Sequence, residues 1–407
     1  MAVTGKPKLL RELNSRLIIE TIRECPSLSR ADLARELGLS QPTVSLIIEA
    51  LVSQGILLET GTGNSSGGRR PILLAINPDY RYVAGVDLSK SEAGIVLGNL
   101  RGDLVAQAAV GFDLDDEGKA VLTRAAEAIK ELCRANRVGL ELLAAVAVAV
   151  PGIYDQTTGL INRVARSFDW EGLVPEEEFK KHFACPILVK NDVNTGAWGE
   201  FWRRKSLGVE NLAYVSVGLG VGAGIILRGQ LLEGCHGMAG EIGFMSLGRE
   251  AMEARYSRYG HLETMASAGA VVERAREIAA AGRPGLLSGL SRGESGRVDF
   301  RLVCRAAALH DEDARRLLED MAVWVGLGVA NLQNVLDLEL IAVGGEVLAA
   351  GDVFLDRLRE TVAAIVCNPP EIVFSAWQEK AVLTGAMAAA LGQVYDSELI
   401  KLESVSG

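Results

Sequence analysis

Apolar residues recur at helical spacing in three short stretches near the start of the chain. Residues 9–23 place Leu and Ile three or four positions apart, and residues 30–37 and 41–54 follow the same period. A capping-box sequence over 29–32 opens the second stretch, and Gly38 supplies a tight turn after it. The pattern predicts three helices, of which the last two form a helix-turn-helix.

The third predicted helix separates an apolar face from a polar one. Ser40 is its expected N-cap, and Pro42 falls in its first turn, where the missing N–H costs nothing. The apolar face consists of Val44, Ile47, Ile48 and Leu51. The polar residues near the start are Ser40, Gln41, Thr43 and Ser45. Because this end of the helix enters the major groove in a helix-turn-helix, we expect these four polar residues to contact DNA.

Two predicted strands follow the third helix and enclose a basic loop. The strands cover 56–60 and 71–76, and the segment between them is rich in Gly and Ser and contains Arg69 and Arg70. A flexible linker has the same composition. The helix caps, the turn glycine, the polar helix face and the basic loop agree with one another, however. Together they favour a DNA-binding wing whose arginines reach phosphates or a minor groove.

Charge is distributed unevenly along the chain. Residues 1–75 carry a net charge of +2 and the remainder carries −12, within a total of −10. This balance excludes a protein that coats nucleic acid along its whole length, and it favours a small basic head on a large acidic body. A single head of this charge would bind an operator weakly, so we expect a homodimer or a higher oligomer on DNA.

The rest of the chain repeats one arrangement of buried strands. The first copy has predicted strands at 82–87, 93–100, 104–110 and 142–150 and a helix at 117–135. The second copy has predicted strands at 212–217, 225–227 and 338–343, with a glycine-rich loop or hairpin at 218–224. Two such copies predict an α/β body of two lobes with a cleft between them.

Composition and cysteine spacing indicate the compartment. The apolar fraction is 49%, and no apolar run reaches the ~18 residues that a membrane span needs. The first residues lack the apolar region of a secretory signal. The six Cys are far apart and form no CxxC pair, which indicates free thiols in a reducing environment. We therefore expect a cytoplasmic protein with no membrane partner.

Several motifs of the body resemble the ROK family, which groups sugar-responsive repressors and sugar kinases. The segment that carries the resemblance is 215–243, VSVGLGVGAGIILRGQLLEGCHGMAGEIG. Further matches are Pro151-Gly152, NDVN at 191–194, LET at 262–264 and Gly344-Gly345. The winged head joined to this body resembles the repressor branch of the family.

The resemblance implies an α/β fold in which an N-terminal winged helix-turn-helix precedes a two-lobed actin-like ATPase (ribonuclease H-like) body. Residues 1–78 are the expected winged head, and 79–200 are the expected first lobe. Residues 201–407 are the expected second lobe, with C-terminal helices that return to the first.

The resemblance also implies a sugar site between the lobes. Family kinases use the Asp of the ND motif as a general base, which matches Asp192 with Asn191 beside it. Glu241 and Glu263 match carboxylates that contact the sugar. Carboxylate oxygens accept hydrogen bonds from hydroxyl groups with defined direction. From the residues alone, Asp192 and Asn194 have an alternative role as turn residues after the strand at 187–189.

The first phosphate loop of the family kinases is altered in this chain. The family has a DxGxT-type sequence after the first strand, and the matching residues here are Asp87, Leu88, Ser89, Lys90 and Ser91. Ser89 replaces the glycine that allows a phosphate to approach the backbone. We therefore expect no kinase activity and no catalytic residues.

The zinc motif of many family members is also altered. Its His position corresponds to Phe244, and its Cys positions correspond to Ala254, Tyr256 and His261. A single remaining ligand does not make a zinc site, so we expect no metal and no cofactor. Phe244 also removes a sugar contact, which suggests a different sugar preference.

These features lead to three hypotheses. The leading one is a DNA-binding regulator, usually a repressor in this family, whose operator affinity changes when a sugar binds between the lobes. The second is an ATP-dependent sugar kinase that retains a DNA-binding head, which an intact first phosphate loop would favour. The third is a regulator controlled by a protein partner instead of a sugar.

Overall fold

The head is a small three-helix domain with a three-stranded sheet. The computed structural model describes residues 7–25, 27–62, 70–90, 92–113, 116–162, 170–204, 207–252, 259–281, 285–290 and 295–397. The head consists of α1 (Pro7–Glu24), β1 (Leu28–Ser29), α2 (Arg30–Leu37), α3 (Gln41–Ser53), β2 (Leu57–Thr62) and β3 (Ile72–Ile76). The strand order β1-β3-β2 is antiparallel throughout, so β2 and β3 form the predicted wing hairpin.

Local chemistry sets the ends of the head's helices as the sequence predicts. At α2, the Ser29 hydroxyl accepts from the Asp32 amide, and the Asp32 carboxylate accepts from the Ser29 amide. Gly38 follows with φ +64, the left-handed conformation that favours glycine. The Ser40 hydroxyl caps α3 by accepting from the Thr43 amide. The two-residue strand β1 was not predicted, because it is too short to show alternation and is defined by its pairing with β3.

The first lobe contains β4 (Tyr82–Asp87), β5 (Glu92–Asn99), β6 (Leu104–Gly111), α4 (Gly118–Ala135), η1 (Leu140–Leu142), β7 (Leu143–Val150), β8 (Ile153–Asp155), β9 (Leu160–Asn162), α5 (Pro175–Lys180), β10 (Ile187–Asn191) and α6 (Asp192–Arg204). The second lobe begins with β11 (Leu212–Val217), β12 (Val221–Leu227), β13 (Gln230–Leu231), η3 (Ile242–Phe244), η4 (Arg249–Met252) and α7 (His261–Ala266). It continues with α8 (Ala268–Ala280), α9 (Leu286–Leu290), η5 (Ser295–Arg297), α10 (Phe300–Ala308), α11 (Glu312–Leu336), β14 (Leu340–Gly344), η6 (Glu346–Ala350), α12 (Asp352–Ala363), β15 (Glu371–Phe374) and η7 (Gln378–Lys380). The helix α13 (Ala381–Ser397) then returns to the first lobe.

Both lobes are built on five-stranded sheets with the same strand order. The order is β6-β5-β4-β7-β10 in the first lobe and β13-β12-β11-β14-β15 in the second. In each sheet the first three strands form an antiparallel meander, and the last two strands add in parallel. The duplicated arrangement confirms the predicted two-lobed α/β body. No helix in the described part of the chain is long and apolar enough to cross a membrane.

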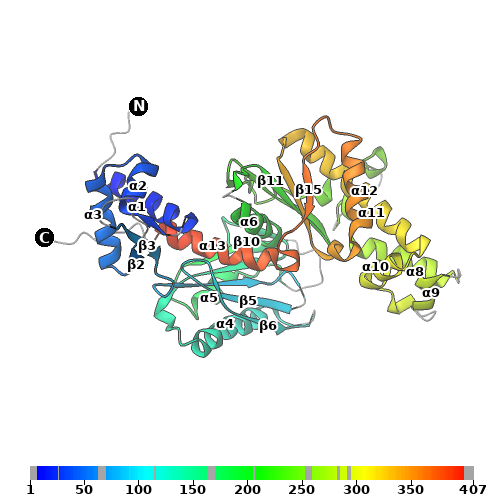
Figure 1. Ribbon diagram of the computed structural model, residues 1–407. Helices are drawn as coiled ribbons and strands as arrows, with labels where there is room; N and C mark the ends of the chain where they lie inside the picture. Colours follow the sequence, from blue (N-terminus) through cyan, green and yellow to red (C-terminus); the bar gives the residue numbers. More distant parts are fainter. Residues whose placement is uncertain are drawn as a thin grey trace.

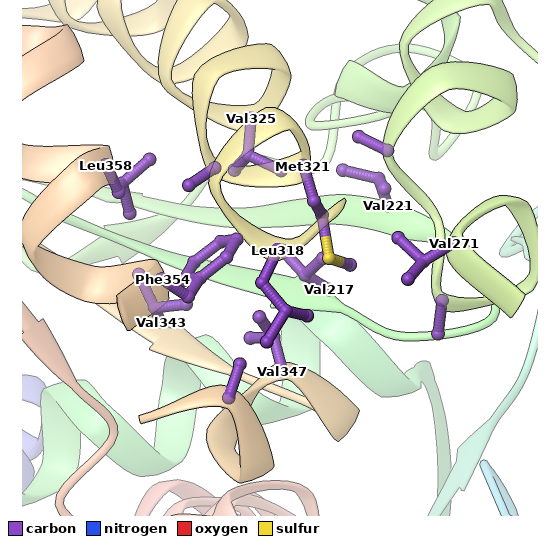
Figure 2. Close-up of a cluster of buried hydrophobic side chains, with 14 of the residues drawn as sticks. Val217, Val221, Val271, Leu318, Met321, Val325, Val343, Val347, Phe354 and Leu358 are labelled. Atoms are coloured by element: carbon purple, nitrogen blue, oxygen red, sulfur yellow. The ribbon is translucent and has the colours of Figure 1, made fainter. Parts of the chain in front are cut away.

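Each lobe has its own apolar core between its sheet and its helices. Figure 2 shows the core of the second lobe, where Val217 and Val343 of the sheet lie opposite Leu318, Met321 and Phe354 of the covering helices. All five side chains are fully buried. A separate cluster lies between α4 and the sheet of the first lobe. Burial of these faces provides the main driving force that holds each lobe together.

A further cluster of buried apolar side chains, which we call the shared core, joins the head to the body. It includes Ile18 and Ile22 of α1, Val83 of β4, and Leu391 and Val394 of α13. In Figure 1, α13 runs from the head across the first lobe toward the second. The same helix packs against β4, β7 and α6. The head is therefore continuous with the packed interior of the first lobe.

The glycine-rich segment at 218–224 was predicted to be a loop or a hairpin. It is a hairpin, because β11 and β12 pair in antiparallel orientation. The strand β12 begins at Val221, so Gly222 and Gly224 lie within it. A Cβ atom at Gly224 would lie 2.5 Å from the Val193 carbonyl oxygen of α6. This glycine therefore permits α6 to pack directly on the backbone of β12.

Candidate functional site

The polar ends of three neighbouring strands meet at one edge of the first-lobe sheet. The strands β4, β7 and β10 are parallel and adjacent. Asp87 pairs with Ala149 of β7, and Asn191 pairs with Val150 of the same strand. Ligands of α/β sheets bind at the carboxyl ends of such strands. The register therefore places Asp87, Asn191 and the following Asp192 around the end of β7.

Asn191 is held in place by protein partners. Its side-chain amide donates to the Gly152 carbonyl oxygen at 2.9 Å and to the Asp192 carboxylate at 3.0 Å. Its side-chain oxygen accepts from the Asn194 amide at 3.0 Å. These bonds fix the junction between β10 and α6. They also orient the neighbouring Asp192 carboxylate.

Asp192 is the first residue of α6, and the pKa of its carboxyl group is raised. Its carboxylate accepts from the Val193 amide at 2.9 Å. Burial, followed by the nearby charges of Asp87 and Glu241, raises the pKa of Asp192 to about 7. Asp87 is itself buried, and burial raises the pKa of that carboxyl. The charges of Asp87 and Glu241 therefore act on Asp192 from the two lobes.

Glu241 and Glu263 belong to neighbouring segments of the second lobe. Glu241 precedes η3, and Glu263 lies in α7, which packs on η3. The Glu263 carboxylate is buried and accepts from the Val221 amide at 3.1 Å, at the start of β12. Burial raises the pKa of Glu263. A hydroxyl-rich ligand here would meet acceptors from two directions, since carboxylate oxygens offer several lone pairs each.

Asp87 is a part of this site that the sequence did not reveal. Its sequence role was the start of a phosphate loop, and its proximity to Asp192 depends on the parallel register of β4, β7 and β10. The available signal was its position at the end of a strand that is buried from Val83 onward. Polar residues at such strand ends are candidates for ligand contact.

The loop after β4 is folded back on itself and tied to another segment. The Asp87 carboxylate accepts from the Ser89 amide at 2.9 Å and from the Ser89 hydroxyl at 2.6 Å. Lys90 donates to the Glu379 carbonyl oxygen of η7 at 2.9 Å. Ser91 lies outside the described residues. The serine that replaces the family glycine thus contacts the carboxylate that opens the loop.

A pocket of about 490 Å³ lies between a first-lobe segment that follows Gly152 and a second-lobe segment that precedes Glu241, and none of the four predicted sugar contacts is among its lining residues. Its lining residues are Ile153, Asp155, Thr157, Thr158, Asn162, Cys235, His236 and Met238. Gly152, which accepts from Asn191, precedes one wall, and the Met238 carbonyl oxygen of the other wall accepts from the Glu241 amide at 3.3 Å. Lys190 and Glu233 form an ion pair of 2.7 Å that ties the lobes together beside it.

The positions that correspond to the zinc ligands of the family carry Phe244, Ala254, Tyr256 and His261. Phe244 is half-buried at the end of η3. His261 is buried, its Nδ1 accepts from the Leu247 amide at 3.1 Å, and its ring packs edge-on against Trp324. Ala254 and Tyr256 lie outside the described residues. Among the residues that are described, no group of three or more His, Cys, Asp or Glu is placed to hold a metal ion.

The predicted DNA-contacting residues lie on the outer side of α3. Ser40 and Gln41 are exposed, and Thr43 and Ser45 are half-buried. The hydroxyls of Ser40 and Thr43 lie 2.7 Å apart, within hydrogen-bond distance. Leu46, which the sequence analysis did not single out, is 57% exposed on the same helix. Its position outside the apolar spacing of the helix was the available signal, and such an apolar side chain suits contact with a thymine methyl group.

The wing is formed by β2 and β3. A bulge between Glu59 and Gly61 interrupts the pairing of the two strands, and Glu59 forms an ion pair with Arg30 of α2 at 3.0 Å. Arg70 is exposed two residues before β3. Arg69 and the rest of the loop from residue 63 lie outside the described residues. The described wing therefore offers one exposed arginine at its base.

Comparison with known proteins matches two parts of the chain to different sequence models. A sequence model of the ROK family matches residues 83–393, and a model described as winged helix-turn-helix DNA-binding matches residues 11–57. The xylose repressor of Caldicellulosiruptor bescii is 28% identical over 358 residues, covering 88% of this chain and 89% of its own. The DNA-binding transcriptional dual regulator NagC of Escherichia coli is 27% identical over 369 residues, covering 89% and 87%.

A solved structure has the same fold over nearly the whole chain. It is described as a ROK family transcriptional regulator, a homologue of the E. coli Mlc protein. It superposes with a TM-score of 0.82 at 23% identity and covers 97% of this chain and 98% of its own. The head and both lobes thus occur together in a known architecture.

Proposed function

Because the chain belongs to the ROK family, we propose that it is a sugar-responsive transcriptional regulator that represses a carbohydrate uptake or catabolism operon in the cytoplasm, acting as a homodimer. The observation that carries the proposal is the presence, in one chain, of a winged head and a body whose carboxylates gather between its lobes. The repressor relatives share both parts, since they match 88–89% of the chain.

The proposed effector is a sugar bound by Asn191, Asp192, Glu241 and Glu263. Asp192 is half-buried and aligned by Asn191, so it is available to accept from a ligand hydroxyl in a fixed direction. Glu263 lies in the second lobe, so a ligand that contacts both groups favours one angle between the lobes. Such a ligand changes operator affinity only through its different affinities for the two states, which is typically worth ~1–3 kcal/mol.

The proposal includes binding without phosphorylation. Asp192 can act as a general base only if a γ-phosphate is held in line with the sugar hydroxyl. Ser89 bonds to Asp87 in the loop that would receive the phosphate, and Lys90 ties this loop to η7, which supports the loss of that role. The substitutions at 244, 254 and 256 support a body without zinc.

A sugar panel tests the proposal directly. We expect one sugar among D-xylose, D-glucose and N-acetylglucosamine to raise the melting midpoint of the purified chain and to weaken operator binding. We also expect no sugar-dependent ADP release and no stoichiometric zinc by elemental analysis. Robust ADP release would favour a sugar kinase that retains a DNA-binding head. A chain that binds its operator but responds to no sugar in a wider panel would favour control by a protein partner.

The head makes a separate prediction about DNA binding. Arg70→Ala should lower affinity for all DNA sequences and make the plot of log affinity against log salt shallower by about one unit, because one phosphate contact is lost. Gln41→Ala or Thr43→Ala should instead change the preferred sequence, by ~1–3 kcal/mol per lost base contact. Titrations at several salt concentrations measure both effects. Arg101→Ala, an exposed arginine of the body, is the control and should change neither.

A further inference from the structure

The helix α6 connects the candidate sugar site to the head. It begins at Asp192 and ends at Arg204, a length of ~20 Å at the usual helical rise. Near its far end, Trp202 lies beneath Arg23 of α1, whose guanidinium carbon is 4.3 Å from the ring centroid. The same guanidinium lies 5.4 Å from the ring of Tyr395 in α13. Arg23 is therefore placed against aromatic rings from two helices of the body.

Close backbone contacts fix α6 between β12 and α13. A Cβ atom at Gly385 of α13 would lie 1.8 Å from the Thr195 carbonyl oxygen of α6. On the other side, β12 reaches the backbone of α6 at Gly224. Interiors packed this closely transmit a displacement because they have no space to absorb it. A shift of α6 is therefore a shift of α13 as well.

The far half of α6 is also bound to the second lobe. Glu200 is fully buried, pairs with Arg204, and accepts from the Ser375 hydroxyl just after β15. The Trp377 indole N–H donates to the Gly199 carbonyl oxygen at 3.0 Å. These contacts make α6 sensitive to the position of the second lobe as well as to the state of Asp192.

Tyr395 secures the other side of the junction. Its hydroxyl donates to the Leu100 carbonyl oxygen, and its ring belongs to the shared core. The ring therefore cannot turn away freely when Arg23 moves. Arginine over an aromatic face is held by the attraction between the cation and the ring, which depends on distance and orientation.

We propose that Arg23 is the positioning residue through which α6 and α13 transmit sugar occupancy to the DNA-binding head. The inference rests on the proposed function, and it names the contact by which the sugar site controls the operator. Because α6 and α13 move together, a shift of α6 on sugar binding moves the rings of Trp202 and Tyr395 together. Arg23 follows both rings, and α1 and the rest of the head change orientation with it.

The test compares Arg23→Ala and Arg23→Lys with the unmodified chain. The measurements are the operator Kd with and without the sugar that stabilises the unmodified chain most, and the Kd for that sugar without DNA. The operator is a duplex selected in vitro by the unmodified chain. Arg23→Ala should bind the sugar within about twofold of normal, while the change in operator Kd caused by sugar falls about fivefold to tenfold. Arg23→Lys keeps the charge with less stacking and should give an intermediate value.

A matched control uses a second arginine–aromatic pair at the boundary between head and body. The Arg81 guanidinium lies 4.6 Å from the Tyr80 ring centroid, and Arg81 directly precedes β4 instead of belonging to α1. Arg81→Ala should leave the sugar response of the operator Kd unchanged. Equal sugar responses of Arg23→Ala and the unmodified chain would overturn the inference. If Arg23→Ala folds poorly, Arg23→Lys decides the same question.

A second measurement tests the inference without a sugar. If no sugar binds, that result counts against the proposed function and leaves this test valid. Asp192→Asn changes the charge at the start of α6 without any ligand. We expect it to alter the operator Kd at least ~3-fold in the unmodified chain and by less than ~2-fold in the presence of Arg23→Ala, as coupled residues do in a double-mutant cycle. Equal effects in the two backgrounds, or no effect in either, would overturn the inference.

Discussion

Gly385→Ala should lower the free energy of unfolding by about 3 kcal/mol or more, a large effect for a single methyl group. The added Cβ would lie 1.8 Å from a carbonyl oxygen of α6 and 3.0 Å from the Gly199 amide. Both contacts are backbone atoms, so neither can rotate aside. The helices α6 and α13 must separate instead, and the apolar contacts between them are lost. Thermal or urea unfolding, followed by circular dichroism, measures the change.

Gly392→Ala provides the matched control within the same helix. A Cβ at Gly392 has no heavy atom within 4 Å. The substitution should stabilise the protein by about 0.5–1 kcal/mol, because alanine restricts the unfolded chain and favours the helix. We therefore expect the same substitution to change the free energy of unfolding in opposite directions at Gly385 and Gly392. Identical unfolding curves for the two variants would mean that α6 and α13 do not cross as closely as described.

Asp192→Asn should make the protein more stable at pH 8 while removing its response to the sugar. Burial and the charges of Asp87 and Glu241 raise the pKa of Asp192 to about 7, above the value of ~3.9 in an unfolded chain. The folded state therefore binds this proton more tightly, and stability falls as the pH rises from about 4 to 7. Asparagine carries no charge, so the variant should gain about 1–3 kcal/mol at pH 8, after allowance for partial solvent exposure. The gain should vanish near pH 4.

Asp103→Asn tests the sign of this argument. The side chain of Asn99, followed by Arg101, lowers the pKa of Asp103. Ionised Asp103 therefore stabilises the folded state above its unfolded pKa, and this contribution is lost as the pH falls through the lower folded value. The variant should be less stable than the parent at pH 8, and the difference should shrink in acid. Unfolding measured at intervals from about pH 2 to 8.5 checks both variants, because the Asp103 contribution is lost only below its unfolded pKa of ~3.9. If Asp192→Asn lost stability at pH 8, the proposed carboxylate environment would be wrong.

The sequence predicted the elements whose signals are local. Ser29 and Gly38 define the ends of α2 through hydrogen bonds and a backbone conformation within a few residues of the chain. The predicted strand at 212–217 coincides with β11. The start of β12 was less clear, because Gly222 and Gly224 lower strand propensity. They are nevertheless strand residues, and their small size is explained by α6, which is distant in the predicted order of elements.

The sequence predicted only those site residues that belong to family motifs. Asn191, Asp192, Glu241 and Glu263 came from a family resemblance, and their roles as sugar contacts stay predictions. Asp87 enters the same carboxylate group through the pairing of two strands with β7, and no pattern within either strand encodes that pairing. The contact of Arg23 with Trp202 and Tyr395 is likewise nonlocal. Long-range packing decides these neighbours, and apolar periodicity does not record it.

The shared core also has a consequence for the order of events during synthesis. Ribosomes add roughly 5–20 residues per second, so α1 to α3 exist for many seconds before α13 is made. Leu391 and Val394 of α13 complete the cluster that includes Ile18 and Ile22 of α1. A nascent head therefore leaves part of its apolar surface uncovered until the segment that carries α13 emerges. By then both lobes have been translated, so the DNA-binding head gains its final support only in a chain that already contains the residues of its sensor.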